Sequence, residues 1–162
     1  KGQFIIPLRQ ELILTEQYLY IQNLRYMDFV DYEITYESSW EDHGAEIPKL
    51  TIQPVVENIF VHGLTNQMCH IHLNVSIKNN TIYISISDNG SGIPREKLTE
   101  LNRSIRDFKT ARYSFGLPSI NHRISLLYGE NYGLTIKSSP ENGTTVTIAI
   151  PDKKSTLGGN IK

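Results

Sequence analysis

Two runs of alternating apolar and polar residues near the middle of the chain constrain its fold most. Apolar side chains stand at every second position from Ile71 to Ile77 and from Ile82 to Ile86. A period of two is typical of a strand with one buried face. The residues between the runs, 78–81, include two asparagines, which suit a tight turn. The pattern therefore predicts a β-hairpin with one face in the core.

The rest of the chain predicts helices and strands around this hairpin. We expect helices from Leu8 to about Met27 and at Ile47–His62, Pro94–Ile105 and Leu117–Tyr128, and strands at Val30–Tyr36, Leu134–Ser138 and Thr144–Ile150. The first helix is expected to be amphipathic, and a polar loop is expected over 38–46. Gly63 and Gly129 indicate helix ends, and Pro54 must lie in a first turn or produce a kink. This order predicts an α+β sandwich, with a largely antiparallel or mixed sheet and helices on one face.

Composition excludes several classes of protein. Hydrophobic residues make up 39% and charged residues 20% of the 162 residues, which argues against a disordered or coiled-coil chain. The formal net charge of -1 gives no field for holding nucleic acid, so none is expected as a partner. Cys69 is the only cysteine, which excludes an internal disulfide and fits a reducing compartment. No apolar run approaches the roughly 20 residues that span a bilayer.

The clearest candidate for a binding site is the segment Asp88-Asn89-Gly90-Ser91-Gly92-Ile93, which follows the second strand of the hairpin. The sheet can hold the Asp88 carboxylate rigidly, while Gly90 and Gly92 allow close approach of a ligand to the backbone. A fixed acceptor beside bare backbone suits a flat heterocycle, and the alternative is an ordinary surface turn. Arg95 replaces the third glycine of a dinucleotide fingerprint, and no P-loop sequence exists, so both of those sites are excluded.

A second candidate group lies on the helix predicted before the hairpin. Asn58 and His62 are four residues apart and share one helix face. An amide oxygen can bind a hard cation such as Mg²⁺, although a polar pair can also be a solvated helix edge. His70 and His72 share a strand face and are an alternative metal pair that lacks a third ligand.

Taken together, four segments resemble the GHKL ATPases, in the variant found in sensor histidine kinases of the YesM/LytS type. The segments are 48–63 for the N box, 88–93 for the G1 box, 115–124 for the G2 box and 143–146 for the closing glycine-threonine turn. They occur in the family's order. The resemblance extends upstream to Glu11 and covers roughly Pro7 to Pro151.

The resemblance implies a Bergerat-type two-layer α/β sandwich that binds ATP and Mg²⁺. Asp88 would accept the adenine amino group, and Asn58 would hold Mg²⁺ and, with His62, form the catalytic pair. The ATP-binding residues implied are Asp88, Gly90, Gly92, Ile93, Gly116, Leu117 and Thr145, together with Lys109 and Arg112 in a lid over 106–115. The N-terminal end of the helix at Leu117 would offer N–H groups to phosphate.

The resemblance also implies a domain order and partners. Residues 1–29 would be a linker helix from a dimerisation and phosphoacceptor region, 30–151 the ATP-binding catalytic domain and 152–162 a flexible tail. The chain starts at Lys1, so we expect a fragment of a longer protein, with the acceptor histidine elsewhere. In the intact protein, expected to be a homodimer, phosphate would pass to that histidine and then to a response regulator. The fragment would be the cytoplasmic part of a bacterial inner-membrane sensor.

Three positions depart from the family pattern. Ser114 and Ser119 stand where the family usually has glycine and asparagine, and Pro54 stands where the ATP-hydrolysing branches have a glutamate. The serines favour one alternative, a degenerate domain that binds nucleotide without transfer. A second alternative is a serine kinase of the anti-sigma type. The proline favours transfer to a protein side chain over rapid hydrolysis.

Overall fold

The computed structural model describes residues 4–27, 29–37, 40, 44–107, 116–140 and 142–152. Its helices are α1 (Leu8–Arg25), α2 (Gln53–Asn58), the π-helical turn η2 (Ile59–Gly63), α3 (Arg95–Arg106) and α5 (Leu117–Tyr128). Its strands are β1 (Ile5–Pro7), β2 (Val30–Tyr36), β3 (Glu46–Pro48), β4 (Cys69–Lys78), β5 (Thr81–Asp88), β6 (Gly133–Ser139) and β7 (Gly143–Pro151). Most of the predicted lid and tail, 108–115 and 153–162, lies outside the described residues.

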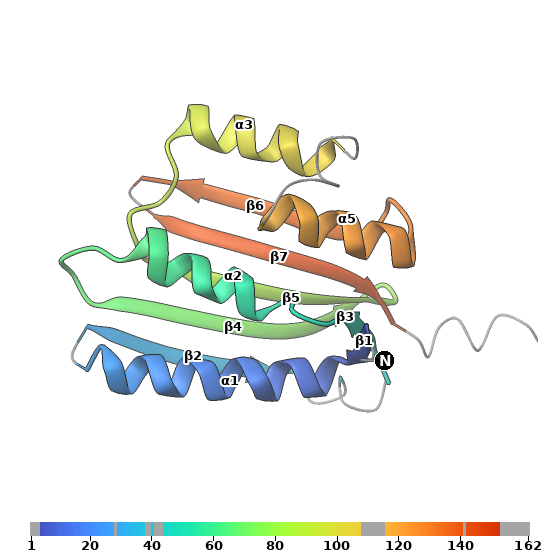
Figure 1. Cartoon of the computed structure of the whole chain (residues 1–162), viewed down its shortest axis with the longest axis horizontal. Coiled ribbons are helices and arrows are strands. Elements are labelled where there is room, and N and C mark those ends of the chain that lie inside the picture. The colour runs from blue at the N-terminus through green and yellow to red at the C-terminus, as the bar shows by residue number, and fades with distance from the viewer. Residues whose placement is uncertain are drawn as a thin grey trace, which may run out of the picture.

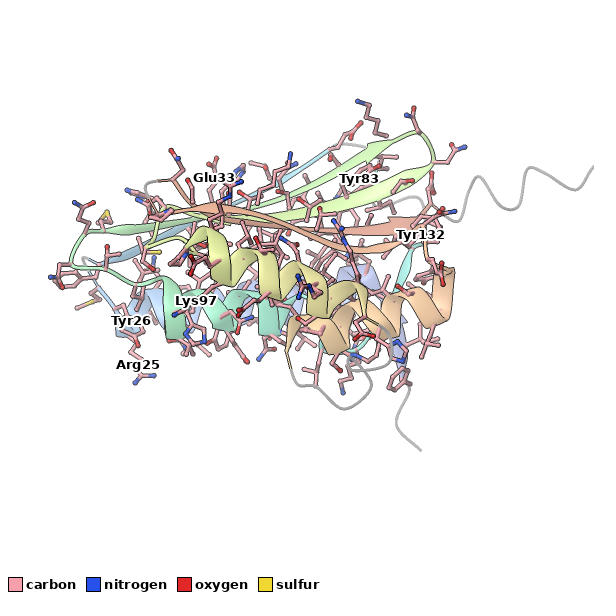
Figure 2. All side chains as sticks on the ribbon, turned by 90° about the horizontal axis from the view of Figure 1, so that it is seen from above. Arg25, Tyr26, Glu33, Tyr83, Lys97 and Tyr132 are labelled. Atoms are coloured by element: carbon pink, nitrogen blue, oxygen red, sulfur yellow. The ribbon has the colours of Figure 1, made fainter. Side chains whose placement is uncertain are left out.

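The larger sheet has five strands in the order β2-β4-β5-β7-β6. β2 runs parallel to β4, and the other neighbours are antiparallel. The helices cover one face of this sheet (Figure 1). In the edge-on view they lie on one side, while Glu33 and Tyr83 point to the other (Figure 2). The predicted two-layer α/β sandwich with a mixed, mostly antiparallel sheet is confirmed.

The central hairpin of β4 and β5 is also confirmed. Asn79 and Asn80 form its two-residue turn with φ angles of 50° and 61°, a conformation that asparagine tolerates better than most residues. The alternate residues predicted to face the core are buried against the helices, among them Leu73 and Ile84 with no exposed surface, except that Ile77 near the turn is partly buried. β5 ends at Asp88, so the hairpin delivers this carboxylate to one end of the sheet.

The single helix predicted over 47–62 was wrong in its first part. Ile47 belongs to β3, which pairs with β1 in a small two-stranded sheet, and α2 begins only at Gln53. Leu50 has a φ of 58°, which no right-handed helix contains. Pro54 lies in the first turn of α2, one of the two places expected for it. Both short strands have three residues, too few to show a period in the sequence.

Helix α1 is confirmed, but it is apolar on two faces rather than amphipathic. Leu8, Leu12 and Leu19 are buried against the sheet, whereas Ile21 and Leu24 are exposed. Towards its end the helix also holds η2 through an aromatic cluster. Phe60 stacks on Tyr26 with ring centroids 5.8 Å apart and meets the edge of Tyr18 at 5.9 Å.

The buried carboxylate of Glu11 joins α1 to the start of α2. It is 1% exposed and accepts N–H groups from Leu50 at 3.2 Å, Thr51 at 2.8 Å and Ile52 at 3.1 Å. The first N–H groups of a helix have no partner within the helix, and Ile52 at the N-cap has no polar side-chain atom. Glu11 therefore stabilises the start of α2 from a different helix.

Arg123 on α5 holds the other side of the same loop. Its guanidinium donates to the carbonyl oxygens of Lys49 at 2.6 Å and Leu50 at 2.7 Å. Burial lowers the pKa of Arg123, and the negative charge of Glu11 opposes that shift. The strained φ of Leu50 persists because hydrogen bonds fix both its N–H and its carbonyl group.

Replacing the Glu11 carboxylate should therefore destabilise the domain. We expect Glu11→Gln to lower the free energy of unfolding by about 2 kcal/mol, because charge-assisted hydrogen bonds from three N–H groups to a buried carboxylate are weakened or lost. Urea denaturation measures this loss. Glu16→Gln, on an exposed position of α1, is the control and should change stability by less than about 0.5 kcal/mol. Equal effects of the two substitutions would contradict this role of Glu11.

Candidate functional site

A cavity of about 750 Å³ lies between the helices and one end of the sheet. This size is ordinary for a small-molecule site. Its polar lining residues are Asn58, His62, Asp88, Ser91, Lys97 and Thr144. The rest of its wall is mainly apolar, with Ile86, Ile136 and Val146 contributed by the sheet and Val55 and Ile59 by the helices. The cavity therefore offers apolar surface together with a few convergent polar groups.

The carboxylate of Asp88 lies at the sheet end of this cavity and is only 9% exposed. Gly90 donates its N–H to Oδ1 at 2.8 Å, and the N–H of Thr144 also hydrogen-bonds the carboxylate. Burial raises the pKa of Asp88, and the two N–H groups partly offset that rise. The result is a fixed, partly desolvated acceptor of hydrogen bonds, as the sequence predicted for a group that binds a heterocycle.

The loop after Asp88 packs backbone against backbone, which explains its glycines. A Cβ atom on Gly90 would lie 2.0 Å from the carbonyl oxygen of Gly63 at the end of η2. A Cβ atom on Gly92, where φ is +65°, would lie 1.9 Å from the carbonyl oxygen of Ser139. No larger residue fits either position without moving backbone. The two glycines thus let the loop lie between η2 and the β6–β7 turn.

Two polar side chains fasten the same loop. Asn89 accepts the N–H of His70 at 2.7 Å and donates to the carbonyl oxygen of Met68 at 3.1 Å, which ties it to the start of β4. Ser91 donates its hydroxyl to the carbonyl oxygen of His62 at 3.0 Å, which ties it to η2. The loop is therefore held on the sheet side and on the helix side.

The opposite wall contains the predicted pair Asn58 and His62. Asn58 ends α2, His62 lies in η2, and both line the cavity. π-Helical turns are rare and occur frequently at functional sites. Glu57 does not line the cavity, and its carboxylate accepts a hydrogen bond from Gln53 at 2.8 Å. Adjacent residues of a helix point in different directions, so Glu57 faces away from the cavity that Asn58 lines.

The N-terminal end of α5 opens on the same cavity. Gly116, at the N-cap with a φ of 81°, and Leu117, the first helical residue, both line it. The N-terminal end of a helix favours negative charge. Ile93 also lines the cavity. Gly90 does not line it, but its N–H group holds the Asp88 carboxylate in place. Lys109 and Arg112, predicted as lid residues, lie outside the described residues, as does Ser114.

The prediction of Thr145 in this site needs correction, because the cavity is lined by Thr144. In a strand, neighbouring side chains point to opposite faces, and Val146, Ile148 and Ile150 on β7 are buried under the helices. Thr144 shares their face, and Thr145 belongs to the open face. The alternation of Val146, Ile148 and Ile150 in the sequence was the signal that could have identified Thr144.

Lys97 on α3 is a charged cavity residue that the sequence analysis did not predict. It is a cation at the rim of the cavity on the helical side of the molecule (Figure 2). One charged residue in a polar helix gives no sequence signal. Within the described residues, no group of three or more His, Cys, Asp and Glu side chains could hold a metal ion, and His70 instead pairs with Asp31 at 3.3 Å.

Comparison with known proteins identifies the family. Residues 44–154 match the family model of histidine kinase-, DNA gyrase B- and HSP90-like ATPases. The chain belongs to this family. The match confirms the predicted GHKL membership, while the YesM/LytS subtype stays a prediction. No helix of the described residues is both long and apolar enough to cross a membrane.

Among the similar proteins are sensor kinases and histidine kinase domains. The chain is 29% identical to the sensor protein kinase HptS of Staphylococcus aureus over 146 residues, which is 90% of this chain and 28% of that protein. The catalytic domain of the histidine kinase ThkA matches with a TM-score of 0.63 at 17% identity, over 94% of this chain and 97% of that one. The histidine kinase domain of a blue-light-activated histidine kinase from Erythrobacter litoralis matches with a TM-score of 0.57 at 16% identity, over 98% of this chain and 70% of that one. These two structures support the fold of this GHKL domain.

The close approach at Gly90 can be tested by adding a single methyl group. We expect Gly90→Ala to destabilise the domain by about 3 kcal/mol or more, because the new Cβ overlaps the Gly63 carbonyl oxygen. Gly44→Ala is the control, since nothing lies within 4 Å of its Cβ and its φ of +58° costs only about 1–2 kcal/mol. Thermal unfolding compares the two variants. A Gly90 variant as stable as the Gly44 variant would show that the loop can move away freely.

Proposed function

We propose that this GHKL domain binds MgATP and that, within a longer protein, it transfers the γ-phosphoryl group to a histidine side chain. The observation that supports ATP most directly is the pairing of Asp88 and Thr144 at the sheet end of the cavity. Adenine has a donor, its amino group, next to an acceptor, N1. The Asp88 carboxylate and the neighbouring Thr144 hydroxyl complement these two groups. Guanine has a carbonyl oxygen in place of the amino group, so it would set an acceptor against the Asp88 carboxylate, which only accepts.

The phosphates and the metal ion belong at the other end of the cavity. The N-terminal end of α5 at Gly116 and Leu117 favours negative charge, and Asn58 offers an amide oxygen on the facing wall. Magnesium ions are commonly held by one or two protein oxygens together with substrate phosphates and water. A single protein ligand at Asn58 is therefore sufficient for a Mg²⁺ ion that arrives with ATP.

The chemical step needs mainly positioning and neutralisation of charge. A nitrogen of the acceptor imidazole would attack the γ-phosphorus, the bond to the bridging oxygen would break, and ADP would leave. Asn58 and the α5 N–H groups would orient and neutralise the phosphates, with His62 beside them on η2. The Glu57 carboxylate accepts a hydrogen bond from Gln53 outside the cavity, so it is not placed to activate a water molecule there. This favours transfer to a side chain over hydrolysis.

The longer protein would supply the acceptor. The chain spans 28% of the length of the sensor kinase HptS, so such relatives contain much that this chain lacks. We assign residues 30–151 to the ATP-binding domain and residues 1–29 to the helix that links it to a dimerisation and phosphoacceptor region. The intact protein would be a homodimeric inner-membrane sensor with this domain in the cytoplasm, and a response regulator would receive the phosphoryl group.

Nucleotide selectivity tests the role of Asp88. Calorimetry should show MgATP binding at least about tenfold more tightly than MgGTP, since a mismatched buried polar group costs roughly 1–3 kcal/mol. Asp88→Asn should lose most ATP affinity, whereas Asp31→Asn on the open sheet face should retain it. Because burial raises the pKa of Asp88, ATP affinity should fall on acidification at a higher pH than an exposed aspartate would give. Equal affinity for the two nucleotides would exclude Asp88 as the group that recognises adenine.

Phosphotransfer tests the reaction itself. The domain is mixed with the acceptor region of its own full-length protein and ATP labelled at the γ-phosphate. We expect Mg²⁺-dependent label on a histidine, loss of that label with Asn58→Ala, and normal labelling with Asn74→Ala, whose side chain bonds Thr35 at 2.8 Å away from the cavity. Label on serine would support the anti-sigma alternative, and ATP binding without labelling would support the degenerate domain.

A further inference from the structure

One face of α3 forms part of the cavity wall, and Lys97 supplies the charge on that face. Lys97 and Leu101 are four residues apart, so they share one side of the helix, and both line the cavity. Arg95 and Arg103, on the same helix, do not line it. Lys97 is the only lysine or arginine among the described residues of the cavity wall. An anionic ligand in the cavity therefore has one lysine beside it.

The charge of this lysine is not used by the rest of the described protein. None of the described residues forms an ion pair or a hydrogen bond with the Lys97 ammonium group. The side chain is exposed, and its long aliphatic stem can lie along the apolar wall beside Leu101 while the charge stays in water at the rim. An ammonium group is a compact point charge that binds phosphate. In the part of the chain that the structure describes, Lys97 is thus an unpaired cation at the mouth of a cavity proposed to hold an anion.

The start of α3 lies beside the part of the cavity proposed for adenine. The loop that begins at Asp88 runs directly into this helix, and Ile93 and Pro94 at the end of the loop line the cavity. Lys97 is the third residue of α3 and so belongs to its first turn. The groups proposed for the metal ion and the outer phosphates, Asn58 and the N-terminal end of α5, belong to other elements. In every adenine nucleotide, the phosphate nearest to the base is the α-phosphate.

We infer that Lys97 binds the α-phosphate of adenine nucleotides, an inference that rests on the proposed ATP binding. ATP carries more negative charge than a single Mg²⁺ ion neutralises, so charge remains for a lysine to meet. The α-phosphate is not transferred, and ATP and ADP carry it in the same place. Lys97 therefore stabilises substrate, transition state and product to the same extent. It determines how tightly the domain holds nucleotide, including the ADP that it must release, and does not accelerate the transfer step.

Calorimetry with Mg²⁺ present compares ATP, ADP, AMP and adenosine as ligands of wild-type protein and of Lys97→Gln. The substitution should weaken the three nucleotides alike, by about fivefold, because a solvent-exposed ion pair is lost, and should leave adenosine unchanged. Lys97→Arg keeps the charge and should retain most of the affinity. Arg95→Gln removes the same charge two residues away, outside the cavity wall, and is the matched control that should change each affinity by less than about twofold. In the phosphotransfer assay, Lys97→Gln should raise the KM for MgATP about fivefold with a much smaller change in the maximal rate.

The outcomes separate this inference from the proposed function. A loss of affinity that spares AMP would place Lys97 on an outer phosphate, and an equal loss for adenosine would place its effect on the base or on the fold; either result overturns the inference. Unchanged binding of all four ligands by Lys97→Gln overturns it as well, while ATP binding by wild-type protein leaves the proposed function standing. A fall in the maximal rate without a rise in KM also contradicts it. If wild-type protein binds none of the four ligands, the proposed function fails together with the inference.

Discussion

The pairing of β5 with β7 is the constraint on which the site depends. Its last pair sets Asp88 against Thr144, and the next strand adds Ser138 to the same row. Because side chains alternate along a strand, a slip of one residue would turn this whole row to the open face. The apolar residues below it, including Ile84 and Ile148, are fully buried under the helices and hold the register. The hydrophobic core therefore fixes the positions of the polar groups at its end.

The helical wall of the cavity is positioned by the loop between β3 and α2. Glu11 from α1 binds N–H groups of this loop and Arg123 from α5 binds its carbonyl groups. A buried carboxylate is costly unless its hydrogen bonds are satisfied, and here the cost is met by three N–H groups. The loop leads directly into α2, which ends at Asn58. Helices α1, α2 and α5 thus meet at this loop, close to the start of the cavity wall.

The sequence predicted those features that depend on local pattern and failed where tertiary contacts decide. The hairpin and α5 were predicted closely, because their alternation and their glycine and proline signals are local. The predicted helix over 47–62 was wrong because the burial of Ile47 in β3 and the strained Leu50 come from contacts with distant segments. The resemblance identified Asp88 and Asn58 as cavity residues. It misplaced the threonine by one position, an error that the strand's own alternation corrects.

The two walls differ in how firmly they are tied to the sheet, which bears on how such a domain can respond to the rest of a longer protein. The wall with Asp88 and Thr144 is part of the central strands β5 and β7, where backbone pairing on both sides resists movement. The wall with Asn58 and His62 includes a π-helical turn and contacts α1 through Glu11 at one end and Phe60 at the other. Within the described residues, α1 therefore contacts both ends of the wall proposed to hold the metal ion and the phosphates. The base is proposed to bind at the other wall, whose position depends on strand register.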